Sequence, residues 1–134
     1  MRVALYGGTG FVGSYLVDHL HAAGHEVSLF DVFYAPDPAV FQRQYDFVTA
    51  TEVVEHLARP GEELARLWSL LRPGGWLGVM TKLVRDRDAF AGWHYKNDPT
   101  HVCFFSADTW RWWARDRGAA LETIGADVIL LEKV

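Results

Sequence analysis

The amino-terminal stretch RVALYGGTGFVGSYLVDHLHAAGHEVSLFD, residues 2–31, decides the fold. Residues 2–6 are a short apolar run that ends at a glycine, which is typical of a buried strand. Residues 11–23 have helical spacing of apolar side chains, and residues 26–30 form a second β-like run that closes at Asp31. A strand, a glycine turn, a helix and a strand in this order predict the first βαβ unit of a parallel sheet, with a right-handed crossover.

The rest of the chain continues the alternation of strands and helices. Strands are predicted at residues 46–51, 76–81, 119–124 and 127–132, and helices at residues 62–71 and 106–117. Ser106 is the expected N-cap of the second of these helices. The last two strands form an antiparallel hairpin. Residues 39–42 suit either a short edge strand or a loop, because Pro36 and Pro38 break any longer helix. The sequence therefore predicts one domain over residues 1–134: a Rossmann-like three-layer α/β sandwich, with a mostly parallel sheet and a C-terminal antiparallel hairpin.

Composition narrows the class of protein. The chain has 134 residues, 50% of them hydrophobic, with 13 Lys and Arg against 17 Asp and Glu. This balance excludes a disordered tail or a coiled coil, and the net charge of −4 disfavours a nucleic-acid module. A single cysteine, Cys103, suits a reducing cytosol, and residues 1–20 contain no continuous apolar run. We therefore expect a cytoplasmic globular protein that binds neither nucleic acid nor membranes.

The loop after the first strand has the glycine spacing of a phosphate-binding turn. Its candidate cofactor-binding residues are Gly7, Gly8, Thr9, Gly10, Phe11, Val12 and Gly13. Gly7 allows a sharp turn, Gly10 lets a phosphate approach the backbone, and Gly13 lets the helix lie close to the strand. Exposed N–H groups at the start of the helix favour an anion. A glycine-rich turn without a ligand is the less favoured alternative.

Asp31 stands at the tip of the second strand, 18 residues after Gly13. A carboxylate at this position can accept hydrogen bonds from both hydroxyls of an adenosine ribose. The same carboxylate would repel a 2′-phosphate, so the residues favour NAD over NADP.

A resemblance to a known family covers residues 1–31. The segment GGTGFVGSYLVDHLHAAGHEV, residues 7–27, resembles the start of extended short-chain dehydrogenases and nucleotide-sugar epimerases, which implies NAD binding. Those enzymes pair a tyrosine with a lysine four positions later, and the lysine lowers the pKa of the tyrosine. No tyrosine of this sequence has a lysine at that spacing, so dehydrogenase or epimerase turnover is not expected.

Residues 31–134 are similar to a different family, the class I S-adenosylmethionine-dependent methyltransferases. The residues that carry the resemblance are YDFVTATEVVEHL (45–57), LLRPGGWLGVMT (70–81) and WHYKNDPTHVCFFSADTW (93–110). The resemblance implies that Asp31 binds the ribose of the cofactor. It also implies that Thr51 and Glu52 face the methionine part of the cofactor and the substrate.

The two resemblances meet at Asp31, which suggests a chimera. The acidic residue that methyltransferases carry near the end of the first strand is missing, since Tyr6 precedes Gly7. Our leading hypothesis is an engineered hybrid that binds an adenosine-containing cofactor, NAD or S-adenosylmethionine, with little or no turnover; a natural recombinant is less favoured. The alternative is an active S-adenosylmethionine-dependent methyltransferase with a small-molecule acceptor.

Four further polar residues are candidates for chemistry. His94 and His101 are candidate general bases that remove a proton from a methyl acceptor. Their segment lacks the paired Cys and His spacing of a structural zinc site. Glu55 and His56 share a helical face with Glu52, at i, i+3 and i+4, and could hold a divalent metal. Solvated charges at a helix end are favoured instead, so no metal is predicted.

Three tryptophans, Trp110, Trp112 and Trp113, lie close together near the predicted last helix. An amphipathic helix with Trp113 inside explains most of this pattern. Three such side chains cannot all face one core, so we expect some exposed aromatic surface and a tendency to self-associate.

Overall fold

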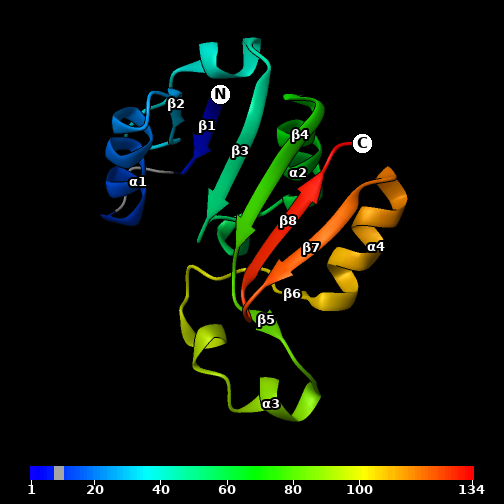
Figure 1. Cartoon of the computed structure of the whole chain (residues 1–134). Coiled ribbons are helices and arrows are strands. Elements are labelled where there is room, and N and C mark those ends of the chain that lie inside the picture. Colours follow the sequence, from blue (N-terminus) through cyan, green and yellow to red (C-terminus); the bar gives the residue numbers. More distant parts are fainter. Residues whose placement is uncertain (8–10) are drawn as a thin grey trace.

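The computed structural model describes residues 1–7 and 11–134, and its centre is a six-stranded sheet of order β2-β1-β3-β4-β8-β7 (Figure 1). The strands are β1 (Arg2–Tyr6), β2 (Glu26–Phe30), β3 (Tyr45–Thr51), β4 (Leu71–Met80), β7 (Ala120–Ile124) and β8 (Val128–Glu132). The first four are parallel, whereas β8 runs antiparallel to both β4 and β7. The predicted Rossmann-like sandwich with a C-terminal hairpin is confirmed.

Helices and a small second sheet connect these strands. The α-helices are α1 (Phe11–Ala22), α2 (Pro60–Ser69), α3 (Arg87–Ala91) and α4 (Ala107–Arg117). The 3₁₀ turns are η1 (Pro38–Gln42), η2 (Val54–His56) and η3 (His94–Asn97), and β5 (Leu83–Val84) pairs in parallel with β6 (Phe105–Ser106). The predicted N-cap of α4 is confirmed, because the Ser106 hydroxyl accepts a hydrogen bond from the Thr109 N–H at 3.2 Å.

The main hydrophobic core lies on the face of the sheet that α2 and α4 cover. Ala4 of β1 and Val48 of β3 belong to this core together with Trp113 of α4. Val3 and Leu5 are also buried, but alternation along the strand places them on the opposite face. No described residue of α1 belongs to the main core, and α1 contacts β2. Figure 1 shows α1 beside β1 and β2, and α2 behind β4.

Two local predictions differ from the structure. Residues 39–42 belong to a 3₁₀ helix, because the Asp37 carboxylate caps it by accepting from the Ala39 N–H at 3.0 Å. Strand β4 begins at Leu71, well before the predicted start at residue 76. Its Pro-Gly-Gly segment is held against the end of the chain, where the Lys133 N–H donates to the Gly75 carbonyl at 2.8 Å. A tertiary contact therefore extends the strand through residues that favour a turn.

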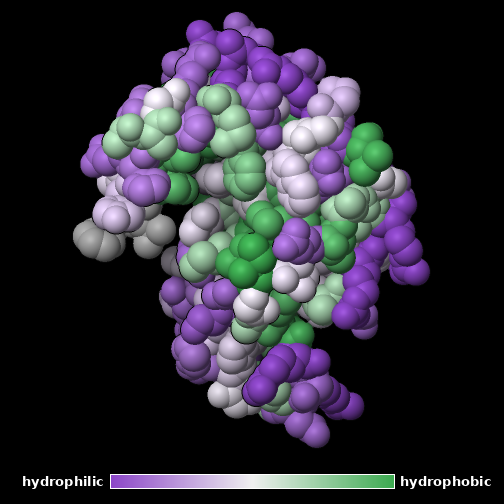
Figure 2. Space-filling view, in the orientation of Figure 1, coloured by the Kyte–Doolittle hydropathy of each residue, from purple (hydrophilic) through white to green (hydrophobic). Residues whose placement is uncertain are grey.

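Of the three tryptophans near α4, only Trp112 is exposed. Trp110 and Trp113 are 1% and 5% exposed, whereas Trp112 is 58% exposed, so the expectation of an exposed aromatic residue is confirmed. Phe33 and Tyr34 in the loop after β2 are also exposed. Figure 2 shows apolar side chains gathered over the strands that lie in front in Figure 1. Self-association through such surface stays a prediction.

The four parallel strands end at one edge of the sheet, which positions the site. Tyr6 of β1 pairs with Phe30 of β2 and Ala50 of β3, and Thr51 pairs with Met80 of β4. The residues that directly follow these strands are Gly7, Asp31, Glu52 and Thr81. Ligands of open α/β sheets bind at this carboxyl edge. Within residues 1–7 and 11–134, no helix is long and apolar enough to cross a membrane.

At the opposite end of β3, Asp46 ties two strands together. Its carboxylate accepts from the Arg2 N–H at 2.7 Å and from Arg72 Nη1 at 2.9 Å. These hydrogen bonds hold the pKa of Asp46 below its usual value, and the bond from the Arg2 N–H has the largest effect. Partial burial of the carboxylate opposes ionisation but does not outweigh them. A carboxylate with a depressed pKa stabilises the fold above its unfolded-state pKa, and that contribution is lost as pH falls through the folded-state pKa.

We therefore expect Asp46→Asn to lower the free energy of unfolding by about 1 kcal/mol at pH 7. The difference from wild type should shrink as pH falls below about 4, the ordinary pKa of aspartate. Urea denaturation across this pH range measures it, with Asp18→Asn, an exposed aspartate of α1, as the matched control. An equal loss at all pH values would contradict this account.

Candidate functional site

The first glycine of the loop makes the sharp turn that the sequence predicts. Gly7 has φ of +75°, and its N–H donates to the Phe30 carbonyl at 2.6 Å. A Cβ at this position would lie 2.4 Å from Cγ2 of Val53, so both backbone conformation and space require glycine. Gly8, Thr9 and Gly10 lie outside the described residues. Phe11, Val12 and Gly13 begin helix α1, as expected for a loop that opens a helix.

Asp31 holds the turn that follows β2. Its Oδ1 accepts from the Phe33 N–H at 2.9 Å and the Tyr34 N–H at 3.2 Å, and its backbone pairs with Ala35. The carboxylate thus stands at the predicted place, at the tip of β2 and one strand away from Gly7. Its role toward a ribose stays a prediction.

The end of β3 has an unusual backbone. Glu52 has φ of +53°, the left-handed region that side chains other than glycine rarely adopt, and its N–H donates to the Met80 carbonyl at 2.8 Å. Such a conformation costs roughly 1–2 kcal/mol and occurs often at functional sites. The strained turn leads from β3 into η2, and it places Val53 against Gly7 at the end of β1.

A buried hydroxyl, that of Tyr95, organises the polar groups at this edge. It lies 2.7 Å from Glu55 Oε1, 2.9 Å from Glu52 Oε2 and 3.3 Å from Thr81 Oγ1. Burial first, and then its hydrogen bonds to the two carboxylates, raise the pKa of the Tyr95 hydroxyl, so it stays protonated. Since one hydroxyl carries one proton, Tyr95 can donate to only one of the two carboxylates at a time.

The two carboxylates therefore ionise at different pH. Partial burial of its carboxyl group, together with the hydrogen bond and negative charge of Glu55, raises the pKa of Glu52 to about 7. For Glu55, burial opposes ionisation, but hydrogen bonds from Glu52 and Tyr95 bring its pKa below the ordinary value. Near neutral pH, Glu55 is the carboxylate that carries the charge and Glu52 is the one that holds a proton part of the time.

The interpretation of Glu55 as a solvated helix-end charge is wrong. Glu55 is 0% exposed, and it lies in the short turn η2. The cause is tertiary: the N–H groups of Val102 and Cys103 donate to the Glu55 carbonyl at 2.8 and 3.2 Å, which lays the later segment over the turn. The Cys103 thiol also donates to the Val54 carbonyl at 3.0 Å, and burial raises its pKa.

Of the two histidines predicted as bases, only His101 joins this cluster. Its Nδ1 lies 2.6 Å from the Tyr95 carbonyl, and its ring lies 4.8 Å from that of His56, centroid to centroid. His94 is exposed, and its Nε2 lies 3.3 Å from Lys82 Nζ. Tyr95 and Thr81 carry no motif of their own, so no pattern in the sequence predicts them as site residues.

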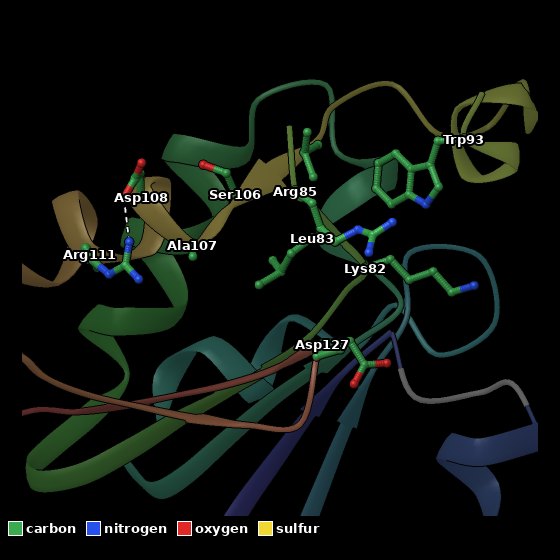
Figure 3. A pocket seen from close by; sticks show the side chains of 11 residues that line it. Lys82, Leu83, Arg85, Trp93, Ser106, Ala107, Asp108, Arg111 and Asp127 are labelled. Atoms are coloured by element: carbon green, nitrogen blue, oxygen red, sulfur yellow. Dashed lines mark hydrogen bonds and ion pairs between the residues drawn. The ribbon is translucent and has the colours of Figure 1, made fainter. Parts of the chain in front are cut away.

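A cavity of about 770 Å³ lies next to this edge of the sheet. It is lined by Lys82, Leu83, Val84, Arg85, Trp93, Ser106, Ala107, Asp108, Arg111, Ala126 and Asp127. In Figure 3, the Asp108–Arg111 ion pair of α4 lies on one side of the cavity and Trp93 on the other. The volume is within the range of small-molecule sites.

Several solved structures that resemble this one are described as methyltransferases. An O-methyltransferase family protein from Burkholderia thailandensis matches with a TM-score of 0.64 at 17% identity, over 98% of this chain and 50% of its own. A SAM-dependent methyltransferase from Archaeoglobus fulgidus matches with a TM-score of 0.70 at 17% identity, over 92% of this chain and 64% of its own. A SAM-dependent methyltransferase from Thermotoga maritima, described as a possible histamine N-methyltransferase, matches with a TM-score of 0.62 at 16% identity. The match covers 99% of this chain and 82% of that protein's chain. The chain therefore has the Rossmann-like methyltransferase fold.

A family model described as "Methyltransferase domain" matches residues 6–124, nearly the whole chain. The chain belongs to this methyltransferase family. No match was found among curated protein sequences. The chain spans only half the length of the Burkholderia thailandensis structure.

The Tyr95 hydroxyl should matter for stability as well as for the site. We expect Tyr95→Phe to lower the free energy of unfolding by about 1.5–3 kcal/mol, because the buried Glu55 carboxylate loses its donor. Urea denaturation at pH 7 measures the change, with Tyr15→Phe, which removes the hydroxyl of a 72% exposed tyrosine, as the control. Equal stability of the two variants would show that this hydrogen bond does not support the fold.

Proposed function

We propose that the chain is a catalytic domain that binds S-adenosylmethionine and transfers its methyl group to a small-molecule nucleophile. The observation that carries the proposal is the polar cluster of Glu52, Glu55, Tyr95 and His101 at the carboxyl end of β3, in a chain whose family match covers residues 6–124. In open α/β sheets, ligands bind at this carboxyl edge.

One described residue supports binding of the adenosine part of this cofactor. Asp31 offers a carboxylate at the tip of β2, the position at which an acid can accept from ribose hydroxyls. At the tip of β1, however, stands Tyr6, whose hydroxyl donates to Glu63 of α2 at 2.8 Å. The methionine part therefore lacks an acidic partner from β1, and Thr51 and Glu52 of the next strand are its proposed partners.

When bound, the cofactor supplies an electrophilic methyl group on a sulfonium. This chain contributes mainly by positioning, since an in-line displacement depends on the alignment of the two reactants. The cavity has room for an acceptor, and two residues that line it, Lys82 and Trp93, lie against the ring of Tyr95. The Tyr95 hydroxyl in turn bonds to the carboxylates of the edge. The base role expected of His101 and His94 stays a prediction, and His101 is the one beside this cluster.

The hypothesis of an engineered hybrid with a nicotinamide site rests on residues 1–31. The family match begins at residue 6 and runs across the junction expected at Asp31, which favours one methyltransferase unit. Neither this match nor the solved structures support NAD as the cofactor. NAD binding is therefore the competing outcome of the cofactor titration.

Calorimetric titration with S-adenosylhomocysteine and, separately, with NAD tests the proposal. We expect S-adenosylhomocysteine to bind and Asp31→Asn to weaken this binding about tenfold or more, because a charge-assisted hydrogen bond to the ribose is lost. Asp37→Asn, in the same loop, is the matched control, because its carboxylate caps η1. Labelled methyl transfer from S-adenosylmethionine to candidate acceptors then tests turnover.

Each outcome of the titration separates the hypotheses. Binding of NAD alone would support the hybrid and refute the methyltransferase proposal. Binding of neither ligand by a protein that unfolds cooperatively would refute both. If Asp31→Asn and wild type bind S-adenosylhomocysteine with equal affinity, Asp31 does not contact the cofactor.

A further inference from the structure

We propose that Glu55, His56 and His101 bind a divalent transition-metal ion beside the proposed methyl-acceptor site. One possible ligand atom from each of these three residues lies within 4.8 Å of the others. Donor atoms that share one ion at about 2.1 Å lie roughly 3.3 Å apart, so small side-chain rotations close the set. The sequence places His101 far from the other two, and only the fold adds it to them.

Both imidazoles are oriented as metal ligands are. His56 Nδ1 lies 2.9 Å from the Thr100 carbonyl, and His101 Nδ1 lies 2.6 Å from the Tyr95 carbonyl. Since a carbonyl can only accept, each Nδ1 is the donor, and in the neutral ring the lone pair then lies on Nε2. In His101 this Nε2 also lies 3.6 Å from Asp98 Oδ2. Histidines that bind metals usually donate their other ring N–H to a carbonyl or carboxylate in this way.

The third ligand has an unmet need for a partner. Glu55 is 0% exposed; its Oε1 accepts from Tyr95, but its Oε2 has no hydrogen-bond partner among the described residues. A buried carboxylate oxygen without a partner is costly, and a bound cation would compensate it directly. His56 Nε2 lies 3.9 Å from Glu55 Oε1, so a lone pair and the carboxylate face the same small volume.

The ligand types define the class of metal. Two imidazoles and one carboxylate suit Zn²⁺, Mn²⁺, Fe²⁺ or Co²⁺, whereas Mg²⁺ and Ca²⁺ prefer oxygen ligands only. Three protein ligands leave positions open for a water or a substrate atom, as in catalytic rather than structural sites. An acceptor oxygen in an open position would lose its proton more readily. That last role rests on the proposed function, whereas metal binding itself does not.

Titration of the full chain with Co²⁺, after removal of any polyhistidine tag, tests the proposal. Binding should produce the visible absorption bands of Co²⁺ with nitrogen and oxygen ligands, and Zn²⁺ should displace it. His56→Ala and His101→Ala should each weaken binding by more than about tenfold, since even loss of an outer partner of a metal ligand costs 10–100-fold. His21→Ala, an exposed histidine of α1, should bind as wild type does.

Thermal denaturation of the same samples guards against misfolding. His56 is exposed, so the melting temperature of His56→Ala without metal should stay close to that of wild type. Zn²⁺ should then raise the melting temperature of wild type but not of this variant, because only the native site binds it. Failure of wild type to bind Co²⁺, or equal binding by all variants, would overturn the metal site.

Binding of S-adenosylhomocysteine by these samples separates the two proposals. Metal binding without cofactor binding would refute the proposed function and leave the metal site intact. Cofactor binding without metal binding would refute the metal site and leave the proposed function intact.

Discussion

The buried carboxylate of Glu55 is the constraint on which the site depends. A charge without access to water is tolerated in a protein only where donors or cations surround it. Here the Tyr95 hydroxyl supplies one donor to its side chain, and the backbone of Val102 and Cys103 pairs with its carbonyl. The irregular segment between β4 and α4 is therefore folded back over η2. The same folding brings His101 to the edge of the sheet.

The left-handed turn at Glu52 connects this segment to the sheet. Its N–H bonds to the Met80 carbonyl of β4, while its carboxylate reaches the Tyr95 hydroxyl. A conformation that costs free energy locally is kept because hydrogen bonds on both sides hold it. One residue thus couples the ends of two central strands to the polar cluster above them.

The carboxyl edge of the sheet has two parts with different side chains. The ends of β1 and β2, with Gly7 and Asp31, present a tight turn and a carboxylate, the groups on which the proposed adenosine site rests. The ends of β3 and β4, with Glu52 and Thr81, lead into the polar cluster and the cavity beyond. Parallel strands bring both halves together because all of them end at the same edge.

The sequence by itself determined the elements whose signals lie within a few residues. Apolar periodicity and glycine turns predicted β1, α1 and β2, and the hydroxyl of Ser106 marked the start of α4. The family match also agrees with the resemblance of residues 31–134. Asp31 and the glycine turn could be placed at the edge from the order of strands alone, because parallel strands leave no other arrangement.

Only the tertiary structure decided the polar cluster. Glu55 and Tyr95 are 40 residues apart, and no local pattern indicates that one buries the other. The start of β4 at Leu71 likewise depends on pairing of Gly75 with Lys133 at the end of the chain. Whether a charged side chain is solvated or buried depends on which distant segment covers it. Sequence periodicity reports the environment along one element, and contacts between distant segments are settled only when the whole chain packs.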